Sequence, residues 1–180
     1  CINIRLQTIK KMIMNKFFLK IFTIALSPFL IGNTNALKAQ NVFIPDTAFL
    51  VPLLNNPAIN INADGFIQVS EANAYTGEIN VEWNGITDLT GIEAFISITV
   101  LNCSNNQISN LNLATNTALT QVVCANNQIN NLNVNTILSL SYLNCSNNQL
   151  SNIDVSANTA LSYLNCSYNG LNILDVSANT

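Results

Sequence analysis

The chain has 180 residues, of which 49% are hydrophobic and only 8% are charged. All six Lys and Arg residues precede Gln40, and all nine Asp and Glu residues follow it. Phosphate backbones and anionic membrane surfaces are bound through Lys and Arg, so the base-free region argues against nucleic acid and anionic membranes as partners. Because His is also absent from the chain, catalysis in that region would lack a His base, a Schiff-base Lys and an Arg clamp.

Residues 1–39 have the organisation of a secretory leader. After Met14, the predicted start, basic residues precede an apolar run over residues 21–31, and small residues follow it. This order is typical of a signal peptide. The run is shorter than the ~20 apolar residues that a membrane-spanning helix needs. We therefore expect cleavage just before Gln40 and a mature chain without a transmembrane segment.

The segment from residue 40 to residue 78 does not repeat, and its centre resembles the calcium-binding loop of EF-hand proteins. Residues 60–71, NINADGFIQVSE, follow the ligand order of that loop, and a glycine at position 65 permits its sharp turn. The resemblance implies that calcium is held by Asn60, Asn62, Asp64, the carbonyl of Phe66, Gln68 and Glu71. Only two of these residues are carboxylates, so we expect weak binding, at ~10⁻⁴ to 10⁻³ M. The alternative is a cap that needs no metal.

Short helices are expected on both sides of this loop. The first spans about Asp46 to Asn55, with Asp46 as its N-cap. Pro52 is expected to interrupt it, because a proline inside a helix costs ~3 kcal/mol. The second spans about Ser70 to Thr76. Together they predict a small helix–loop–helix cap, which covers the end of a repeat array as solenoids require.

From residue 79 to residue 180 the sequence repeats, with four cysteines at a fixed interval of 21 residues. Around the cysteines the units read IxxLxCxxNxI from Ile98, LxxVxCxxNxI from Leu119, and LxxLxCxxNxL from Leu140 and Leu161. An earlier, degenerate unit has Val81 at the cysteine position and Asn84 at the asparagine position. A period of this length is typical of a solenoid of stacked units. The units resemble the leucine-rich repeat family, and its secreted, internalin-like bacterial members in particular.

The repeat also predicts how each unit folds. In every LxC stretch the side chains alternate, so Leu and Cys point inward from a short strand while the residue between them points outward. Strands of successive units should pair in parallel, ~4.8 Å apart. The predicted fold is an α/β-type leucine-rich repeat solenoid, with parallel strands on the concave face and short extended or 3₁₀ segments on the convex face. The domain order is leader 1–39, cap 40–78 and repeats 79–180, with further repeats expected in the complete protein.

Two sets of inward-facing residues should form ladders along the solenoid. We interpret Cys103, Cys124, Cys145 and Cys166 as buried, unpaired side chains. Disulfides and a zinc site are the alternatives, although stacked Cβ vectors point the same way and the spacing is not that of a zinc motif. The family resemblance implies that Asn106, Asn127, Asn148 and Asn169 point inward and satisfy the backbone where the chain leaves the strand. The ATNT and SANT stretches are predicted to be tight turns in which Ser and Asn bond to the local backbone.

The outward strand positions form the predicted ligand-binding surface. Tyr142 and Tyr163 occupy the same position in adjacent units, so they should lie side by side and offer a broad contact area with polar tips. The candidate contact residues are Gln121, Val123, Tyr142, Asn144, Tyr163, Asn165 and Tyr168. The alternative is that tyrosine at this position simply favours a strand.

These features predict a non-catalytic bacterial recognition module, secreted or displayed at the cell surface, that binds a protein or a glycan and requires no cofactor. The alternative is a calcium-stabilised structural or adhesion segment of a larger secreted protein or enzyme. A glycosidase needs a pair of carboxylates. The pair considered, Asp88 and Glu93, lies in one short segment with no evident pocket, which argues against an enzyme.

Overall fold

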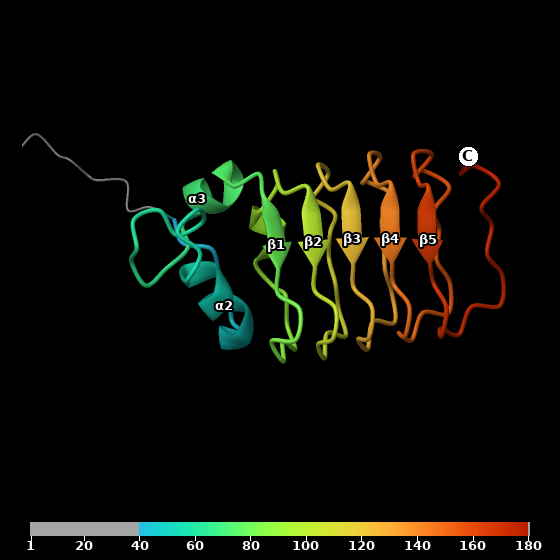
Figure 1. Ribbon diagram of the computed structural model, residues 1–180, viewed down its shortest axis with the longest axis horizontal. Helices are drawn as coiled ribbons and strands as arrows, with labels where there is room; N and C mark the ends of the chain where they lie inside the picture. The colour runs from blue at the N-terminus through green and yellow to red at the C-terminus, as the bar shows by residue number, and fades with distance from the viewer. Residues whose placement is uncertain (1–39, 180) are drawn as a thin grey trace, which may run out of the picture. The chain divides into compact units, whose positions relative to one another are not determined.

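The computed structural model describes residues 40–179, which form two short helices followed by a stack of repeating units, here called rungs (Figure 1). The helices are α2 (Thr47–Leu54) and α3 (Val69–Ala74), and a 3₁₀ helix, η1 (Ile92–Ala94), lies in the first rung. The strands are β1 (Glu78–Asn80), β2 (Val100–Asn102), β3 (Gln121–Val123), β4 (Tyr142–Asn144) and β5 (Tyr163–Asn165). The predicted leader, residues 1–39, lies outside the described residues and stays a prediction.

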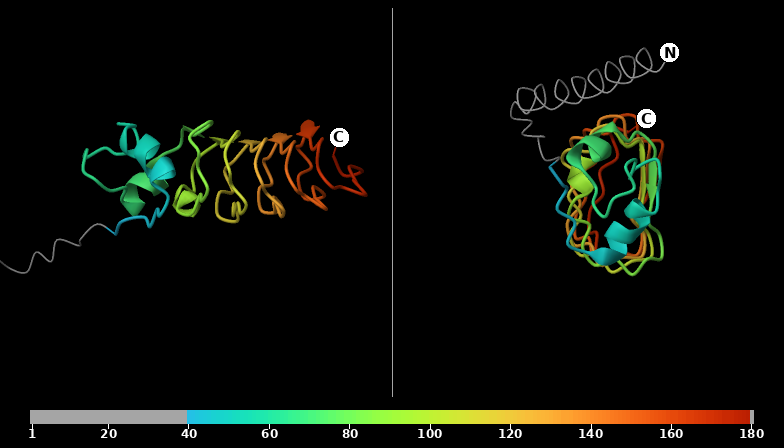
Figure 2. Two further views of the ribbon diagram at one scale, coloured as in Figure 1. Left: turned by 90° about the horizontal axis from the view of Figure 1, so that it is seen from below. Right: turned by 90° about the vertical axis from the view of Figure 1, so that its left-hand side faces the viewer.

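Each rung contributes one three-residue strand to a parallel sheet with the order β1-β2-β3-β4-β5. The register advances by one repeat at each step, so that Val100 pairs with Gln121 and Tyr142 pairs with Tyr163. Seen along the solenoid, the rungs superpose and the strands lie on one side (Figure 2). This confirms the predicted leucine-rich repeat solenoid.

The interior of the rungs is a continuous apolar core. The middle residue of each central strand is fully buried, as Leu101, Val122 and Leu143 show. Across the core, Leu113 and Val155 are buried as well and belong to its opposite wall. One rung cannot bury its apolar face alone, and stacking supplies the missing neighbours on both sides.

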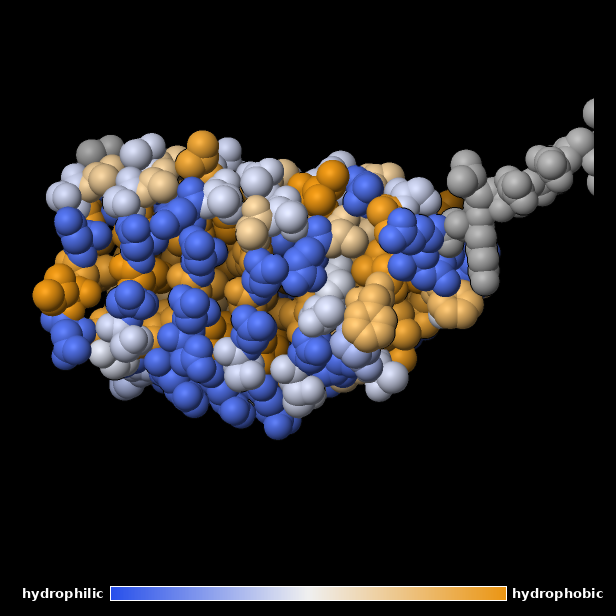
Figure 3. All heavy atoms as spheres, turned by 180° about the vertical axis from the view of Figure 1, so that it is seen from behind, coloured by the Kyte–Doolittle hydropathy of each residue, from blue (hydrophilic) through white to orange (hydrophobic). Residues whose placement is uncertain are grey.

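The convex side, opposite the strands, consists mainly of turns and extended segments, with η1 as a single helical turn in the first described rung. Figure 3 shows this face, on which polar side chains form rows that cross successive rungs. A set of Asn and Asp residues, one in each successive rung, holds each turn locally: their side-chain oxygens accept the backbone N–H two residues later at 2.9–3.2 Å. Its members are Asn112, Asn133, Asp154 and Asp175.

The helix α2 begins after its N-cap residue, Asp46, as predicted, but it continues through Pro52. The prediction that Pro52 interrupts the helix was therefore wrong. The proline lies near the end of a short helix, where it removes a single backbone hydrogen bond. Phe49 and Leu53, only 0% and 2% exposed, hold the helix in the core, and their burial offsets that loss.

Asp46 also ties the helices to the first rung. Its Oδ1 atom caps α2 by accepting the N–H of Ala48 at 2.8 Å. Its Oδ2 atom accepts from the N–H and hydroxyl of Thr87, at 2.8 and 3.0 Å, and from the N–H of Asp88 at 3.1 Å. Burial alone would raise the pKa of Asp46, but these hydrogen bonds together hold it below the ordinary value. A single carboxylate thus serves both the helix cap and the contact with the solenoid.

Candidate recognition surface

The cysteine ladder runs through the core directly behind the sheet. Cys103, Cys124 and Cys145 are fully buried, Cys166 is partly buried, and all four thiols are free. Burial raises the pKa of Cys103 to about 12 and, with a smaller contribution from Cys166, that of Cys145 to about 12. Burial, the largest cause, also raises the pKa of Cys124 well above its ordinary value. Because the thiolate is the reactive form, the buried thiols act as packing groups.

The strand-end asparagines form a ladder that satisfies the backbone of each bend. The Nδ2 atom of Asn127 donates to the carbonyl oxygens of Cys103, Cys124 and Ala125, at 3.0, 3.1 and 3.3 Å. Its Oδ1 atom accepts the N–H of Ile108 at 3.0 Å. The equivalent bonds are made by Asn106, Asn148 and Asn169.

Asn84, at the same position in the degenerate unit, does not join this ladder. Its side chain is exposed and donates to the carbonyl of Glu82 at 3.0 Å. In the part of the chain that the structure describes, β1 is the first strand of the sheet, so no earlier rung supplies the carbonyl groups that the counterparts of Asn84 bind. Asn84 thus occupies the asparagine position of the repeat in sequence, but it does not make the ladder hydrogen bonds of its counterparts.

A second asparagine ladder lies on the convex side, where the sequence predicted only local turns. Asn116 and Asn158 are 0% exposed. Each donates two hydrogen bonds, 2.8–3.0 Å long, to carbonyl oxygens of the preceding rung. The prediction that these asparagines bond locally was wrong, because the residue that fixes each turn lies four positions earlier. The sequence signal for this ladder was the recurrence of Asn-Thr shortly before a core leucine. In one rung, Ile137 replaces the asparagine.

The exposed side of the sheet carries an aromatic pair. The rings of Tyr142 and Tyr163 are stacked, with centroids 4.1 Å apart and an interplanar angle of 2°. They come from paired positions on β4 and β5, so the expectation that they lie side by side is met. Tyr163 is 42% exposed, which leaves a flat aromatic surface open to a ligand.

Amide groups border this pair. Gln121 and Val123, on the neighbouring strand β3, are partly exposed. The Oδ1 atoms of Asn144 and Asn165 accept from the N–H and hydroxyl of the serine two residues later, at 2.8–3.2 Å. Within the described residues their Nδ2 donors have no acceptor. Tyr168 does not lie on the sheet: it is in the following turn, 79% exposed and with φ +54°.

The loop that resembles an EF-hand brings its two carboxylates close to the other candidate ligands. The carboxylate of Asp64 accepts from the side-chain amides of Asn62 and Gln68 at 3.0–3.2 Å. The carboxylate of Glu71 accepts the backbone N–H groups of Ile61, Asn62 and Gln68 at 2.9–3.3 Å. These N–H groups supply the positive charge density that a cation would supply. Across residues 40–179, no three His, Cys, Asp or Glu side chains are grouped to hold a metal ion.

Asn60, the first candidate calcium ligand of the loop, has a buried side chain. Its Nδ2 atom donates to the carbonyls of Leu54 and Asp64, at 3.1 and 3.0 Å. Its Oδ1 atom is buried and, among the described residues, has no hydrogen-bond partner. An orphaned buried oxygen is costly, and a cation is one partner that would satisfy it.

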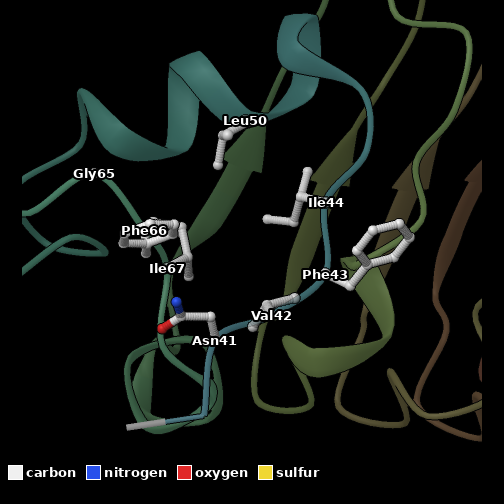
Figure 4. Close-up of a pocket in the computed structure, with 8 residues that line it drawn as sticks. All are labelled: Asn41, Val42, Phe43, Ile44, Leu50, Gly65, Phe66 and Ile67. Carbon is white, nitrogen blue, oxygen red and sulfur yellow. The ribbon is translucent and has the colours of Figure 1, made fainter. Parts of the chain in front are cut away.

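An apolar pocket of about 360 Å³ lies where the segment before α2 passes the loop. Figure 4 shows Ile44 and Leu50 facing Phe66 and Ile67 across it. The segment is fixed there by a hydrogen bond of 2.8 Å from the N–H of Val42 to the carbonyl of Ile67. The pocket lacks ionisable side chains among its lining residues, so it offers packing space and no catalytic chemistry.

The two acidic residues considered for catalysis are engaged locally. Asp88 accepts the N–H of Thr90 at 2.8 Å, and Glu93 accepts the N–H of Gly91 at 2.8 Å. Glu93 is also bonded to the side chain of Asn112 at 3.4 Å. Both carboxylates therefore stabilise turns.

Stacked 21-residue rungs, a parallel sheet and internal cysteine and asparagine ladders define a leucine-rich repeat solenoid. It is similar to the functional domain of InlJ from Listeria monocytogenes, which includes a cysteine ladder, with 37% identity, a TM-score of 0.70 and coverage of 78% of this chain and 31% of that one. Internalin C2 of the same organism gives 27% identity, a TM-score of 0.53 and coverage of 68% and 52%. Internalin InlF, also from that organism, gives 20% identity, a TM-score of 0.61 and coverage of 81% and 50%.

These similarities show an internalin-like leucine-rich repeat fold. The chain spans only 31% to 52% of the length of those structures. No protein-family model and no curated protein matches the sequence. Within residues 40–179, no helix has the length and apolar character needed to cross a membrane.

Proposed function

We propose that this protein is a secreted or surface-displayed recognition module that binds a protein or a glycan through the exposed side of its sheet, without catalysis. The observation that carries the proposal is the stacked pair of Tyr142 and Tyr163, with ring centroids 4.1 Å apart and bordered by the side-chain amides of Asn144 and Asn165. Exposed aromatic rings with polar tips are the side chains most enriched at binding hot spots. Here they are held rigidly by adjacent strands, which lowers the entropy lost on binding.

Charge narrows the ligand class. The region after Gln40 carries nine acidic residues and no Lys, Arg or His, so it attracts cationic and neutral ligands and repels anionic ones. Its carboxylates at Asp88 and Glu93 are committed to turns. Export is supported by the leader pattern of residues 1–39 and by the burial of three of the four ladder thiols, which protects them from oxidation outside the cell.

Binding of the labelled chain to panels of extracellular proteins and of glycans tests the proposal. We expect at least one ligand, and we expect its binding to be lost in the double variant Tyr142→Thr, Tyr163→Thr. Threonine suits a strand, so the fold should survive. A matched control is Leu138→Asn, which removes a large side chain, 64% exposed, from outside the sheet. Hydrolytic activity with no ligand binding would refute the proposal.

A second candidate role is calcium-dependent ordering of the loop over residues 60–71. The buried, unpartnered Oδ1 atom of Asn60 and the nearby carboxylates of Asp64 and Glu71 support it. Calcium would have to displace the N–H groups that now donate hydrogen bonds to these carboxylates, so weak binding is expected, at ~10⁻⁴ to 10⁻³ M. Titration calorimetry with calcium measures it, with Asn60→Ser as the variant. An unchanged thermal midpoint and no heat in millimolar calcium would refute this role.

A further inference from the structure

A row of residues in the left-handed backbone region crosses all the rungs at the turn after the strands. We call it the left-handed row. Its φ angles lie between +53° and +59°. The members are Trp83, Asn105, Asn126, Asn147 and Tyr168. Backbone hydrogen bonds of 2.9–3.2 Å from each of the first four to the next rung hold the row in line.

The residues at the two ends of the row have side chains that are unusual in this backbone region. Asparagine tolerates this backbone region, but bulky side chains adopt it at a cost. Trp83 and Tyr168 nevertheless occupy it, and they are 76% and 79% exposed. Since so little of either ring is buried, packing does not offset the strain. Strained residues of this kind cluster at ligand clamps and other functional sites.

The asparagines between them form a directed chain of amides. Glu82 accepts from the Nδ2 atom of Asn105 at 2.9 Å, and Asn105 accepts from that of Asn126 at 2.9 Å. The chain stops there. Within the described residues, the Oδ1 atom of Asn126 and the whole side-chain amide of Asn147 have no protein partner. The row therefore presents unused hydrogen-bonding groups beside the exposed ring of Tyr168.

We infer that the left-handed row binds a neutral glycan chain that lies along the solenoid axis. This inference rests on the proposed recognition function and adds a second contact surface to it, at the turn after the strands, with a stated ligand class. Sugar rings offer apolar faces that stack on Trp83 and Tyr168, and hydroxyl groups that both donate to and accept from amides. Sialylated or sulfated glycans are disfavoured, because Glu82 lies beside the row and the described region has no basic side chain. A peptide would need pockets for its side chains, whereas the anchors of this row are open to solvent.

The test uses substitutions that favour the fold. Trp83→Asn and Tyr168→Asn install the residue that the middle three rungs already carry at this position. If the rings serve a ligand, both variants keep or raise the thermal midpoint while binding weakens about thirtyfold, the loss that a single interface hot spot causes. The probe is an array of linear neutral oligosaccharides of glucose, galactose, mannose and N-acetylglucosamine, with sialylated and sulfated versions beside them. Leu138→Asn is the matched control.

The outcomes separate this inference from the proposed function. Binding of a neutral oligosaccharide that is lost in both row variants, and retained in Leu138→Asn, supports it. Binding that survives both row variants but is lost in the Tyr142→Thr, Tyr163→Thr variant overturns it and leaves the sheet as the binding surface. It is also overturned if only anionic glycans or peptides bind, if no glycan binds, or if the row variants melt at lower temperature.

Discussion

The strand-end asparagine ladder gives the sharpest test of how the rungs are held together, and Asn127→Asp is the variant that isolates it. The two side chains have nearly the same shape. Aspartate keeps the oxygen that accepts the N–H of Ile108, but it places a second oxygen where Nδ2 now donates to three carbonyl groups at 3.0–3.3 Å. Only the donor is lost.

The loss of two N–H donors costs about 2 kcal/mol, at about 1 kcal/mol for each bond. A carboxylate facing carbonyl oxygens also has a raised pKa, and each unit of that rise costs about 1.4 kcal/mol at neutral pH. With a rise of about one pKa unit, we therefore expect Asn127→Asp to lower the free energy of unfolding by about 3 kcal/mol at pH 7, a large part of the roughly 5–15 kcal/mol typical of a domain. Asn130→Asp is the matched control, because Asn130 is exposed and a surface change of this kind stays within about 0.5 kcal/mol.

Urea unfolding between about pH 7 and about pH 4 measures the effect, because this range includes the unfolded pKa of an aspartate. A group whose pKa is raised on folding destabilises the protein fully above the folded value, and the penalty disappears below the unfolded value, about 3.9 for Asp. The stability of the Asn127→Asp variant relative to wild type should thus recover as the pH falls, whereas Asn127→Ala should show no such recovery. If Asn127→Asp and Asn130→Asp unfold at the same urea concentration, the ladder does not act as a donor and the reasoning is refuted.

Three further predictions follow from single contacts. Asp46→Asn keeps the helix cap but loses the acceptor for the first rung, so we expect about 1–2 kcal/mol of destabilisation after solvent screening. Asp46→Ala also loses the cap, which costs about 1 kcal/mol more. If urea unfolding gives the same free energy for both variants, the two roles of Asp46 are contradicted. Because the pKa of Asp46 is lowered, its contribution is present above about pH 4 and is lost as the pH falls further. The raised pKa of the buried ladder thiols predicts the opposite trend, with stability lost as the pH rises above about 8.5. A thiol reagent should modify these cysteines only after unfolding, and rapid labelling of the native chain, detected by mass spectrometry, would disprove this. Of the two Asn-Gly sites, Asn84–Gly85 should deamidate first, because among the described residues the N–H of Gly85 has no acceptor and is free to attack the amide carbon. At Asn169–Gly170 the glycine N–H is bonded at 2.8 Å to a carbonyl of the preceding rung and the amide is engaged in the ladder, so equal rates by peptide mass spectrometry would contradict the assignment.

The sequence was sufficient to predict the rungs, because their signal is repeated. Every unit places apolar residues at the same alternating positions, and four copies with one period leave little freedom in register. The stacking of Tyr142 on Tyr163 follows directly, since residues one period apart on parallel strands must be neighbours. The short helices of the cap were also visible, through the N-cap at Asp46 and the loop between them.

The features that the sequence analysis missed depend on contacts between rungs. Asn116 lies in a stretch rich in Thr and Asn, where local turn chemistry explains the composition equally well. Only the stacked structure brings the carbonyls of the preceding rung within 2.9 Å of its amide. The left-handed row was hidden for the same reason, because its asparagines are adjacent to the ladder asparagines and share their residue type. Pro52 was misjudged because burial of neighbouring side chains offset a local penalty.

The two asparagine ladders differ in how strictly the fold requires them. At the strand end, Asn127 satisfies a backbone N–H as well as carbonyl groups. On the convex side, the amide of Asn158 serves carbonyl groups alone, and its own oxygen is buried without a partner in the described region. An unmet N–H is rarer in proteins than an under-satisfied carbonyl, which has two lone pairs. Isoleucine at position 137, 0% exposed, therefore gives up little hydrogen bonding, removes an orphaned oxygen and adds apolar burial. The convex ladder tolerates a substitution because its asparagines bond only to carbonyl groups. The strand-end ladder is regular because its asparagines also bond to backbone N–H groups.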